Sequence, residues 1–122
     1  SGDCILRYVN DMKDRPDVVA VDEAFMIPGS AVSLLQLFRS GISIVVSSLQ
    51  LSAMCVPFSE IRDMMPYATS IEICPAVCPE TGKDAFYTIR KSDSKDEIVV
   101  GGSELYEPRC WELHGEMNKG SK

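Results

Sequence analysis

Val18-Val19-Ala20-Val21-Asp22-Glu23 is the stretch of sequence that decides the fold. Its uninterrupted apolar run predicts a strand that is buried on both faces, as strands of a parallel sheet are. Two carboxylates directly follow this run. Ligands of open α/β sheets lie beyond the carboxyl ends of the strands. We therefore expect Asp22 and Glu23 at the rim of the sheet, where a substrate is held. The alternative is that both are solvated residues that open a loop, because most acidic side chains are exposed.

An acidic strand end is also typical of nucleotide-binding sheets. In such sheets one carboxylate holds Mg²⁺ on the phosphates, and the next acts as a base or orients water. The site then needs a phosphate-binding loop of the form GxxxxGK(S/T). Residues 1–21 contain no Gly-rich loop before a helix, and the pair Gly82-Lys83 is followed by Asp84. We expect that pair to form a turn.

Composition and charge narrow the class of protein. The chain has 122 residues, of which 45% are hydrophobic and 25% charged, as in one soluble globular domain. Its net charge of −6 argues against a dedicated surface for nucleic acid or for an anionic membrane. No apolar run approaches the ~18 residues that span a bilayer, and no signal peptide opens the chain. We expect a cytoplasmic protein and, because the chain begins with Ser-Gly, a piece of a longer one.

The segments around the acidic strand predict a βαβ unit. Residues 1–17 are expected to form an amphipathic helix that covers the sheet. Ser30 should cap a helix over residues 31–40, which Gly41 then ends from the C′ position. Residues 42–49 are predicted to form a second buried strand. Strand, helix and strand in this order predict two parallel strands joined by a right-handed crossover.

Further along the chain, shorter elements are predicted. Ser59 should cap a short helix that ends at Met65, and residues 71–74 should form a third strand. Residues 85–91 and 97–100 are expected to be the two arms of a hairpin.

Five cysteines in a chain without a secretory signal favour free thiols or metal ligands over disulfides. Three residues separate Cys74 from Cys78, and three separate Cys110 from His114, on either side of the predicted hairpin. Such a CxxxC…CxxxH set is suited to a structural zinc in a zinc ribbon. The stronger CxxC…CxxC spacing is absent, so the alternative is a group of ordinary buried thiols and a surface histidine. The remaining cysteines are Cys4 and Cys55.

The order of these pieces resembles the thymidine kinases that combine a P-loop domain with a small zinc-ribbon lasso domain. Five stretches in register, from the acidic strand to the last cysteine, carry the likeness. They are residues 19–23, Leu49 with Pro57-Phe58, residues 76–78, residues 85–88, and residues 100–102 leading to Tyr106 and Cys110.

The resemblance implies an α/β fold in two parts. A partial P-loop-type parallel sheet with a βαβ unit should occupy residues 1–70. A small zinc-ribbon or lasso subdomain with a β-hairpin should follow over residues 71–115, with a polar tail at residues 116–122. The family is usually tetrameric, so a homo-oligomer is expected.

The resemblance also implies an activity, which is ATP-dependent phosphoryl transfer to the 5′-hydroxyl of thymidine. Glu23 would be the general base on that hydroxyl, and Asp22 would be linked to Mg²⁺. The nucleoside would lie in a closed pocket, with its base edge held by the lasso loop. The implied substrate-binding residues are Met26, Leu49, Phe58, Thr88, Val99, Gly101 and Tyr106.

The chain departs from the family at the nucleotide and nucleoside sites. The 122 residues contain no P-loop, so ATP and Mg²⁺ would bind only if an upstream segment or a partner chain supplied one. Where the family has an aromatic residue that stacks on the base, this chain has Ala53. Where basic residues follow it in the family, this chain has Cys55 and Val56. Binding of thymidine or another deoxynucleoside should therefore be weak or lost.

The ribbon departs from the family as well. It keeps the first cysteine of each pair, Cys78 and Cys110, while the second positions hold Thr81 and Leu113. The implied zinc ligands are then Cys74, Cys78, Cys110 and His114. We expect a partial or degenerate thymidine kinase domain that is inactive alone. The alternative is a non-catalytic binding or assembly module that kept the fold.

Overall fold

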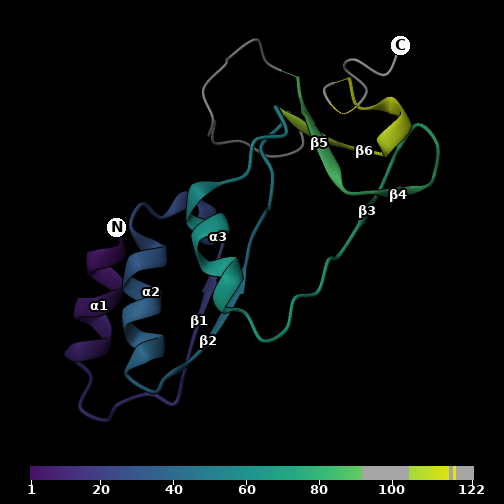
Figure 1. Cartoon of the computed structure of the whole chain (residues 1–122). Coiled ribbons are helices and arrows are strands. Elements are labelled where there is room, and N and C mark those ends of the chain that lie inside the picture. Colours follow the sequence, from purple (N-terminus) through teal and green to yellow (C-terminus); the bar gives the residue numbers. More distant parts are fainter. Residues whose placement is uncertain (92–104, 116, 118–122) are drawn as a thin grey trace. The chain divides into compact units, whose positions relative to one another are not determined.

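The fold is given by a computed structural model that describes residues 1–91, 105–115 and 117 (Figure 1). The chain divides into two compact units. The first unit comprises Ser1–Gln50 and Phe58–Thr69, and the second comprises Leu51–Pro57 and the described part of Ser70–Lys122.

A parallel pair of strands forms the centre of the first unit. β1 (Val18–Asp22) pairs with β2 (Ser43–Ser47), so that Asp22 lies opposite Ser47. α2 (Ser30–Arg39) connects the two strands, which confirms the predicted parallel βαβ unit.

Three helices pack on this sheet. α1 (Gly2–Asn10) lies against α2, as Figure 1 shows, and α3 (Ser59–Met64) contacts α2 as well. The apolar core between the helices and the sheet has four buried members, which are Val9, Leu34, Leu37 and Ile42. α1 is shorter than the predicted helix over residues 1–17, because charged residues replace the apolar ones after Val9 and Pro16 disfavours helix at the residue before it.

The two strands are covered on one face, so the prediction of burial on both faces is wrong. Along each strand, exposed residues alternate with half-buried ones. The half-buried set, which includes Val19 and Val46, packs against the helices, whereas Val18 and Val45 are more than half exposed. A run of Val and Ala carries no polar residue to mark the open face, which is why the sequence pattern did not reveal it.

The two ends of α2 differ in how well the sequence predicted them. Gly41 has a left-handed φ of 101°, and its N–H donates to the Phe38 carbonyl (3.0 Å). The next N–H, of Ile42, donates to the Leu37 carbonyl (3.2 Å), which completes a Schellman motif. The predicted C′ role of Gly41 is confirmed.

At the N-terminus of α2, Ser30 is the first helical residue and not the predicted cap. Gly29 precedes it with a left-handed φ of 80°. The Glu60 carboxylate accepts hydrogen bonds from the N–H groups of Gly29 (3.1 Å) and Ala31 (2.8 Å), while the Ser30 hydroxyl donates to the Ala24 carbonyl (3.0 Å). A carboxylate from α3 therefore satisfies the exposed amides of α2.

Two predictions for the segment after residue 58 are wrong. Ser59 is the first residue of α3, and Phe58 takes the N-cap position. A 3-10 turn, η2 (Met65–Tyr67), follows. Residues 71–74 form no strand, and Ile71 and Ile73 are each more than half exposed. Within the described part of the chain, no neighbouring strand offers these residues a hydrogen-bonding ladder, so their β-branched composition alone does not produce one.

The second unit consists of two small antiparallel pairs. β3 (Ala76–Val77) pairs with β4 (Asp84–Ala85) around a turn in which Gly82 has a φ of 74°, so the predicted turn at Gly82-Lys83 is confirmed. β5 (Tyr87–Arg90) pairs with β6 (Tyr106–Arg109), which leads into η3 (Trp111–Leu113). The predicted second hairpin arm, residues 97–100, lies outside the described residues.

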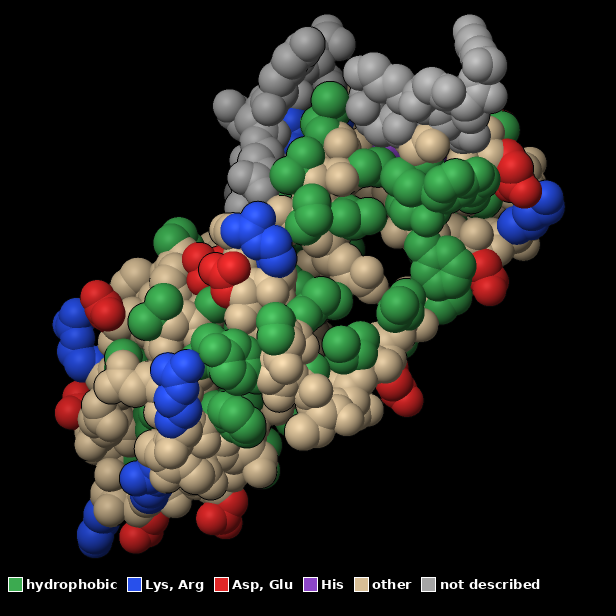
Figure 2. Space-filling model, in the orientation of Figure 1, with side chains coloured by type: hydrophobic (Ala, Val, Ile, Leu, Met, Phe, Trp, Pro, Cys, Tyr) green, Lys and Arg blue, Asp and Glu red, His purple; other side chains and the backbone are tan. Residues whose placement is uncertain are grey.

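Apolar side chains reach the surface of both units, as Figure 2 shows. In the residues that the structure describes, no helix has the length and apolar character needed to cross a bilayer.

Candidate active site at the strand ends

Asp22 ends β1 and Ser47 ends β2, at the same edge of the parallel pair. Because the two residues are register partners, the Ser47 hydroxyl donates a hydrogen bond to Asp22 Oδ1. The same carboxylate oxygen accepts the N–H of Glu23 (2.9 Å). Two donors thus fix the Asp22 carboxylate, which remains exposed at the carboxyl end of the sheet.

Glu23 stands in a left-handed backbone conformation, with φ 53° and ψ 43°. This conformation costs a non-glycine residue ~1–3 kcal/mol, and such strained residues gather at functional sites. Glu23 is the N-cap of η1 (Ala24–Met26), and its carbonyl accepts the N–H of Met26 (3.0 Å). The chain therefore turns sharply at Glu23 and leaves its side chain exposed next to Asp22.

A small apolar cluster holds this turn in place. Ala24 is fully buried against Phe58 and Ile61. The ring centroids of Phe25 and Phe58 lie 4.6 Å apart, and the Phe25 N–H donates to the Ser48 hydroxyl (3.3 Å) just beyond β2. The strained residue is thus held by packing on its C-terminal side and by the sheet on its N-terminal side.

The residues implied for nucleoside binding fall into three groups. Phe58 is buried and Met26 half-buried beside this turn, and Leu49 is exposed just after β2. Thr88 and Tyr106 lie on the paired strands β5 and β6 of the second unit. The other two, Val99 and Gly101, lie outside the described residues.

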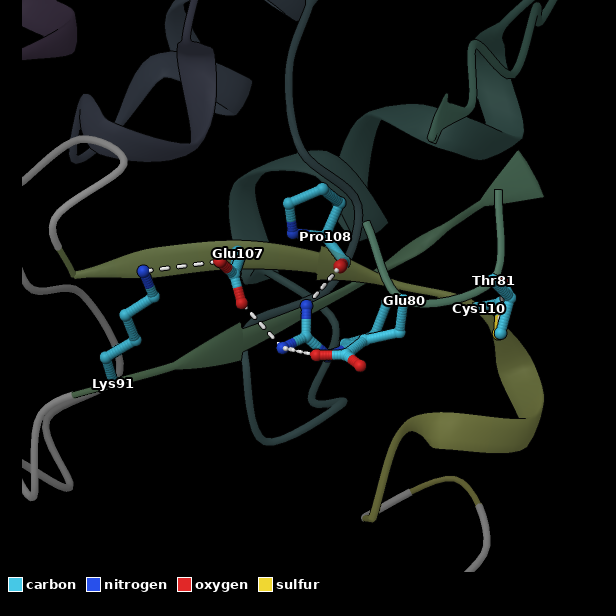
Figure 3. Close-up of polar contacts among 7 residues, drawn as sticks. Glu80, Thr81, Lys91, Glu107, Pro108 and Cys110 are labelled. Carbon is cyan, nitrogen blue, oxygen red and sulfur yellow. Dashed lines mark hydrogen bonds and ion pairs between the residues drawn. The ribbon is translucent and has the colours of Figure 1, made fainter. Parts of the chain in front are cut away.

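Cys78 and Cys110 are brought together in the second unit. They are 0% and 2% exposed and pack in one cluster with Ala85. The Thr81 hydroxyl donates to Cys110 Sγ (3.4 Å) and is also within hydrogen-bond reach of Cys78 Sγ. Figure 3 shows Thr81 beside Cys110.

The Cys78 thiol and the Glu112 carboxyl both have a lowered pKa. Burial raises the pKa of the Cys78 thiol, but hydrogen bonds from the Thr81 hydroxyl and from three backbone amides outweigh it and bring the pKa to about 6. The side chain of Cys110 hydrogen-bonds with Glu112. That contact, followed by one from Lys83 at 3.1 Å, lowers the pKa of the Glu112 carboxyl.

His114 and Cys74 are placed elsewhere. His114 is 2% exposed, and its Nε2 lies 2.7 Å from the Thr88 carbonyl, so Nε2 carries the proton that this oxygen accepts. Its Nδ1 then faces Cys55 Sγ at 3.8 Å. Cys74 is exposed. Across residues 1–91, 105–115 and 117, no three His, Cys, Asp or Glu side chains gather closely enough to hold a metal ion.

An ion-pair network joins β6 to the turn after β3 and to the residue after β5, as Figure 3 shows. Arg109 of β6 lies 2.5 Å from Glu107 and 3.7 Å from Glu80, and Lys91 lies 3.3 Å from Glu107. The Arg109 guanidinium beside Glu107 keeps the pKa of that carboxyl below its usual range. These contacts tie β6 to the turn after β3.

Three residues near the predicted sites were missed in the sequence. Ser47 carried a usable signal, because it lies at the end of the second apolar run and parallel strands end at one edge. Glu60 and Cys55 carried none, since each reaches its partner across a long stretch of chain. Cys55 has a left-handed φ of 59°, which composition does not predict.

Comparison with known families adds one finding. The family model described as "TK: Thymidine kinase" matches residues 3–114. The match includes both strand ends with Asp22 and Ser47, and it extends through Cys78 and Cys110 to His114.

Proposed function

The chain belongs to the thymidine kinase family, and from this premise we propose that its acidic strand end serves phosphoryl transfer from ATP to the 5′-hydroxyl of a deoxynucleoside. Glu23 is the general base that accepts the proton of that hydroxyl, and Asp22 is the carboxylate linked to Mg²⁺. The P-loop is supplied by an upstream segment or by a partner chain.

One observation carries the proposal, which is the arrangement of Asp22, Glu23 and Ser47 at the carboxyl ends of two parallel strands. Asp22 is held through Oδ1 by two hydrogen bonds, and among the described residues Oδ2 has no hydrogen-bond partner. Glu23 is exposed and held by strained backbone. A carboxylate with a reference pKa of about 4.3 is ionised at neutral pH and can accept the hydroxyl proton.

Magnesium fits this donor set only in part. Asp22 offers one carboxylate, and Mg²⁺ is usually held by one or two carboxylates together with substrate phosphates. When bound, the ion neutralises charge on the phosphates. The phosphates themselves need backbone amides and a lysine that this chain's 122 residues do not supply in a P-loop.

The experiment that tests the function is a coupled assay of ADP release on a chain provided with a P-loop. Release that depends on added thymidine supports the proposal, and release that is the same without nucleoside contradicts it. The second candidate is a binding or assembly module that kept the fold, which Ala53 in place of the stacking aromatic favours. Complete absence of ADP release from the P-loop-bearing chain would favour that candidate.

Thymidine should bind weakly to the chain, and Ala53→Phe should strengthen binding about tenfold to a hundredfold. An aromatic platform under a base contributes about 1–3 kcal/mol, and the methyl group of Ala53 offers no such surface. Calorimetric titration of both proteins with thymidine measures the difference. Ala53→Leu is the matched control, because it adds volume without an aromatic face. Equal gains from both substitutions, or none from Ala53→Phe, would show that stacking at this position is not what is missing.

We also propose one structural zinc per chain, bound by Cys74, Cys78, Cys110 and His114. Thiolate and imidazole are ligands that zinc prefers, and Cys78 and Cys110 already lie together. His114 would have to exchange its contacts with Thr88 and Cys55 for the metal.

Elemental analysis should therefore find about one zinc per chain, as expected for a closed four-ligand structural site. Cys78→Ala should lose the metal, whereas Cys4→Ala, in the first unit, should keep it. A chain without stoichiometric zinc would reject the site. Retention of zinc by His114→Ala would remove His114 from the ligand set.

A further inference from the structure

Glu60 binds the main chain at the N-terminus of α2 with both of its carboxylate oxygens. Oε2 accepts the N–H of Gly29 (3.1 Å), and Oε1 accepts the N–H of Ala31 (2.8 Å). Gly29 has a left-handed φ of 80°, so the chain turns here as it enters the helix. The cap comes from α3, and it fixes the segment that precedes α2.

Hydrogen bonds connect this capped helix start to Glu23. The buried Ser30 hydroxyl donates to the Ala24 carbonyl (3.0 Å), and the Ser30 N–H donates to the Ile27 carbonyl (3.1 Å). The Ile27 N–H donates to the Ala24 carbonyl (3.1 Å). The Met26 N–H donates to the Glu23 carbonyl (3.0 Å). The residues between Glu23 and α2 thus form one hydrogen-bonded turn, and the carboxylate cap holds its far end.

We propose that Glu60 is a positioning residue for Glu23, which it holds in place through the turn between them. Its role rests on the proposed function, in which Glu23 is the general base. The left-handed φ of 53° at Glu23 persists only where the surroundings fix it. Ile61 packs on Ala24 at the start of the turn, and Glu60 binds its end, so one helix holds both ends. A misplacement of about 1 Å in a reacting group can lower a rate about a hundredfold.

The first test measures the turn and needs no turnover. Glu60→Gln keeps the shape of the side chain, but one of the two hydrogen bonds is lost, because an amide has a single acceptor oxygen and its NH₂ group would face an N–H donor. Exchange of the Met26 amide hydrogen, followed by NMR, should become about fivefold or more faster, since loss of one hydrogen bond shifts a local opening equilibrium by about that factor. Asp63→Asn is the matched control, because it removes an exposed carboxylate from the same helix, and it should leave this rate unchanged.

The second test measures kcat of the chain supplied with a P-loop. Glu60→Gln should lower kcat about tenfold to a hundredfold, whereas Asp63→Asn should not change it. In the Glu23→Gln background, Glu60→Gln should change kcat by less than about twofold, because a residue that acts through another has no effect once the other is removed. A residue that only stabilised α2 would lower kcat by the same factor in both backgrounds.

An unchanged Met26 exchange rate in Glu60→Gln overturns the proposal. So does faster exchange with an unchanged kcat, or an equal loss of kcat in both backgrounds. If Glu60→Gln does not fold, Glu60→Asp replaces it with the same expected results, because its side chain keeps the charge but is too short to bridge both amides. A P-loop-bearing chain without thymidine-dependent turnover would reject the proposed function, and the exchange rate would still decide whether Glu60 holds the turn.

Discussion

We expect no thymidine-dependent release of ADP from the 122-residue chain alone, even with saturating ATP and Mg²⁺. Phosphoryl transfer requires that the γ-phosphate be held in line and its charge neutralised, and P-loop amides, a P-loop lysine and magnesium perform these tasks. Asp22 by itself recruits magnesium poorly, since magnesium is usually held by one or two carboxylates together with substrate phosphates that other groups must hold in place. Glu23 can accept the hydroxyl proton, but it cannot hold the γ-phosphate in line for transfer.

A coupled assay measures this result directly, with a thymidine kinase that contains a P-loop as the positive control. The chain is assayed with thymidine, without thymidine, and as its Glu23→Gln variant. Thymidine-dependent turnover by the chain that disappears in Glu23→Gln would show that the 122 residues suffice for catalysis, against our account.

When the chain is supplied with a P-loop, Glu23→Gln should lower kcat about 100- to 10,000-fold. General-base catalysis contributes a factor of this size, and the amide is isosteric with the carboxylate but accepts no proton at neutral pH. KM for thymidine should change little, because the lost interaction develops in the transition state. The measurement is the steady-state rate over a range of thymidine concentrations.

Glu72→Gln is the matched control, since Glu72 is also an exposed glutamate but lies in the irregular segment after η2. It should leave kcat unchanged. A Glu23→Gln enzyme that keeps its kcat would show that another group takes the hydroxyl proton. A rise in KM with unchanged kcat would show that Glu23 binds substrate and does not act as the base.

Local sequence signals predicted the elements that depend on local interactions. The two apolar runs gave β1 and β2, and the helix between them made the strands parallel. Gly41 ended α2 because only glycine takes its left-handed φ without strain. The position of Asp22 at a strand end could be predicted because the apolar run of β1 ends there.

Features that depend on distant partners could not be predicted. α2 is capped by Glu60, a residue 29 positions beyond Ala31, so the serine beside the helix start was a misleading signal. β5 pairs with β6, a strand that lies further along the chain than residues 97–100, the expected partner. His114 lies against Cys55, 59 positions earlier, and no spacing rule for metal ligands anticipates that contact.

Burial of the sheet was misjudged for a related physical reason. Apolar residues on both sides of a strand predict cover on both sides, but the cover is provided by other elements. In the first unit, the helices occupy the side of Val19 and Val46, which leaves Val18 and Val45 exposed. Residues 71–74 likewise have strand-like composition and, among the described residues, no strand to pair with.

Transfer of the labelled γ-phosphate of ATP to thymidine tests the central claim most directly. The assay compares this chain supplied with a P-loop with its Glu23→Gln variant, and thymidine 5′-monophosphate is identified by mass. We predict labelled thymidine 5′-monophosphate from the unsubstituted protein and a product level lower by about 100-fold or more from the variant. Equal product from both proteins would contradict the assignment of the acidic strand end as the site of phosphoryl transfer.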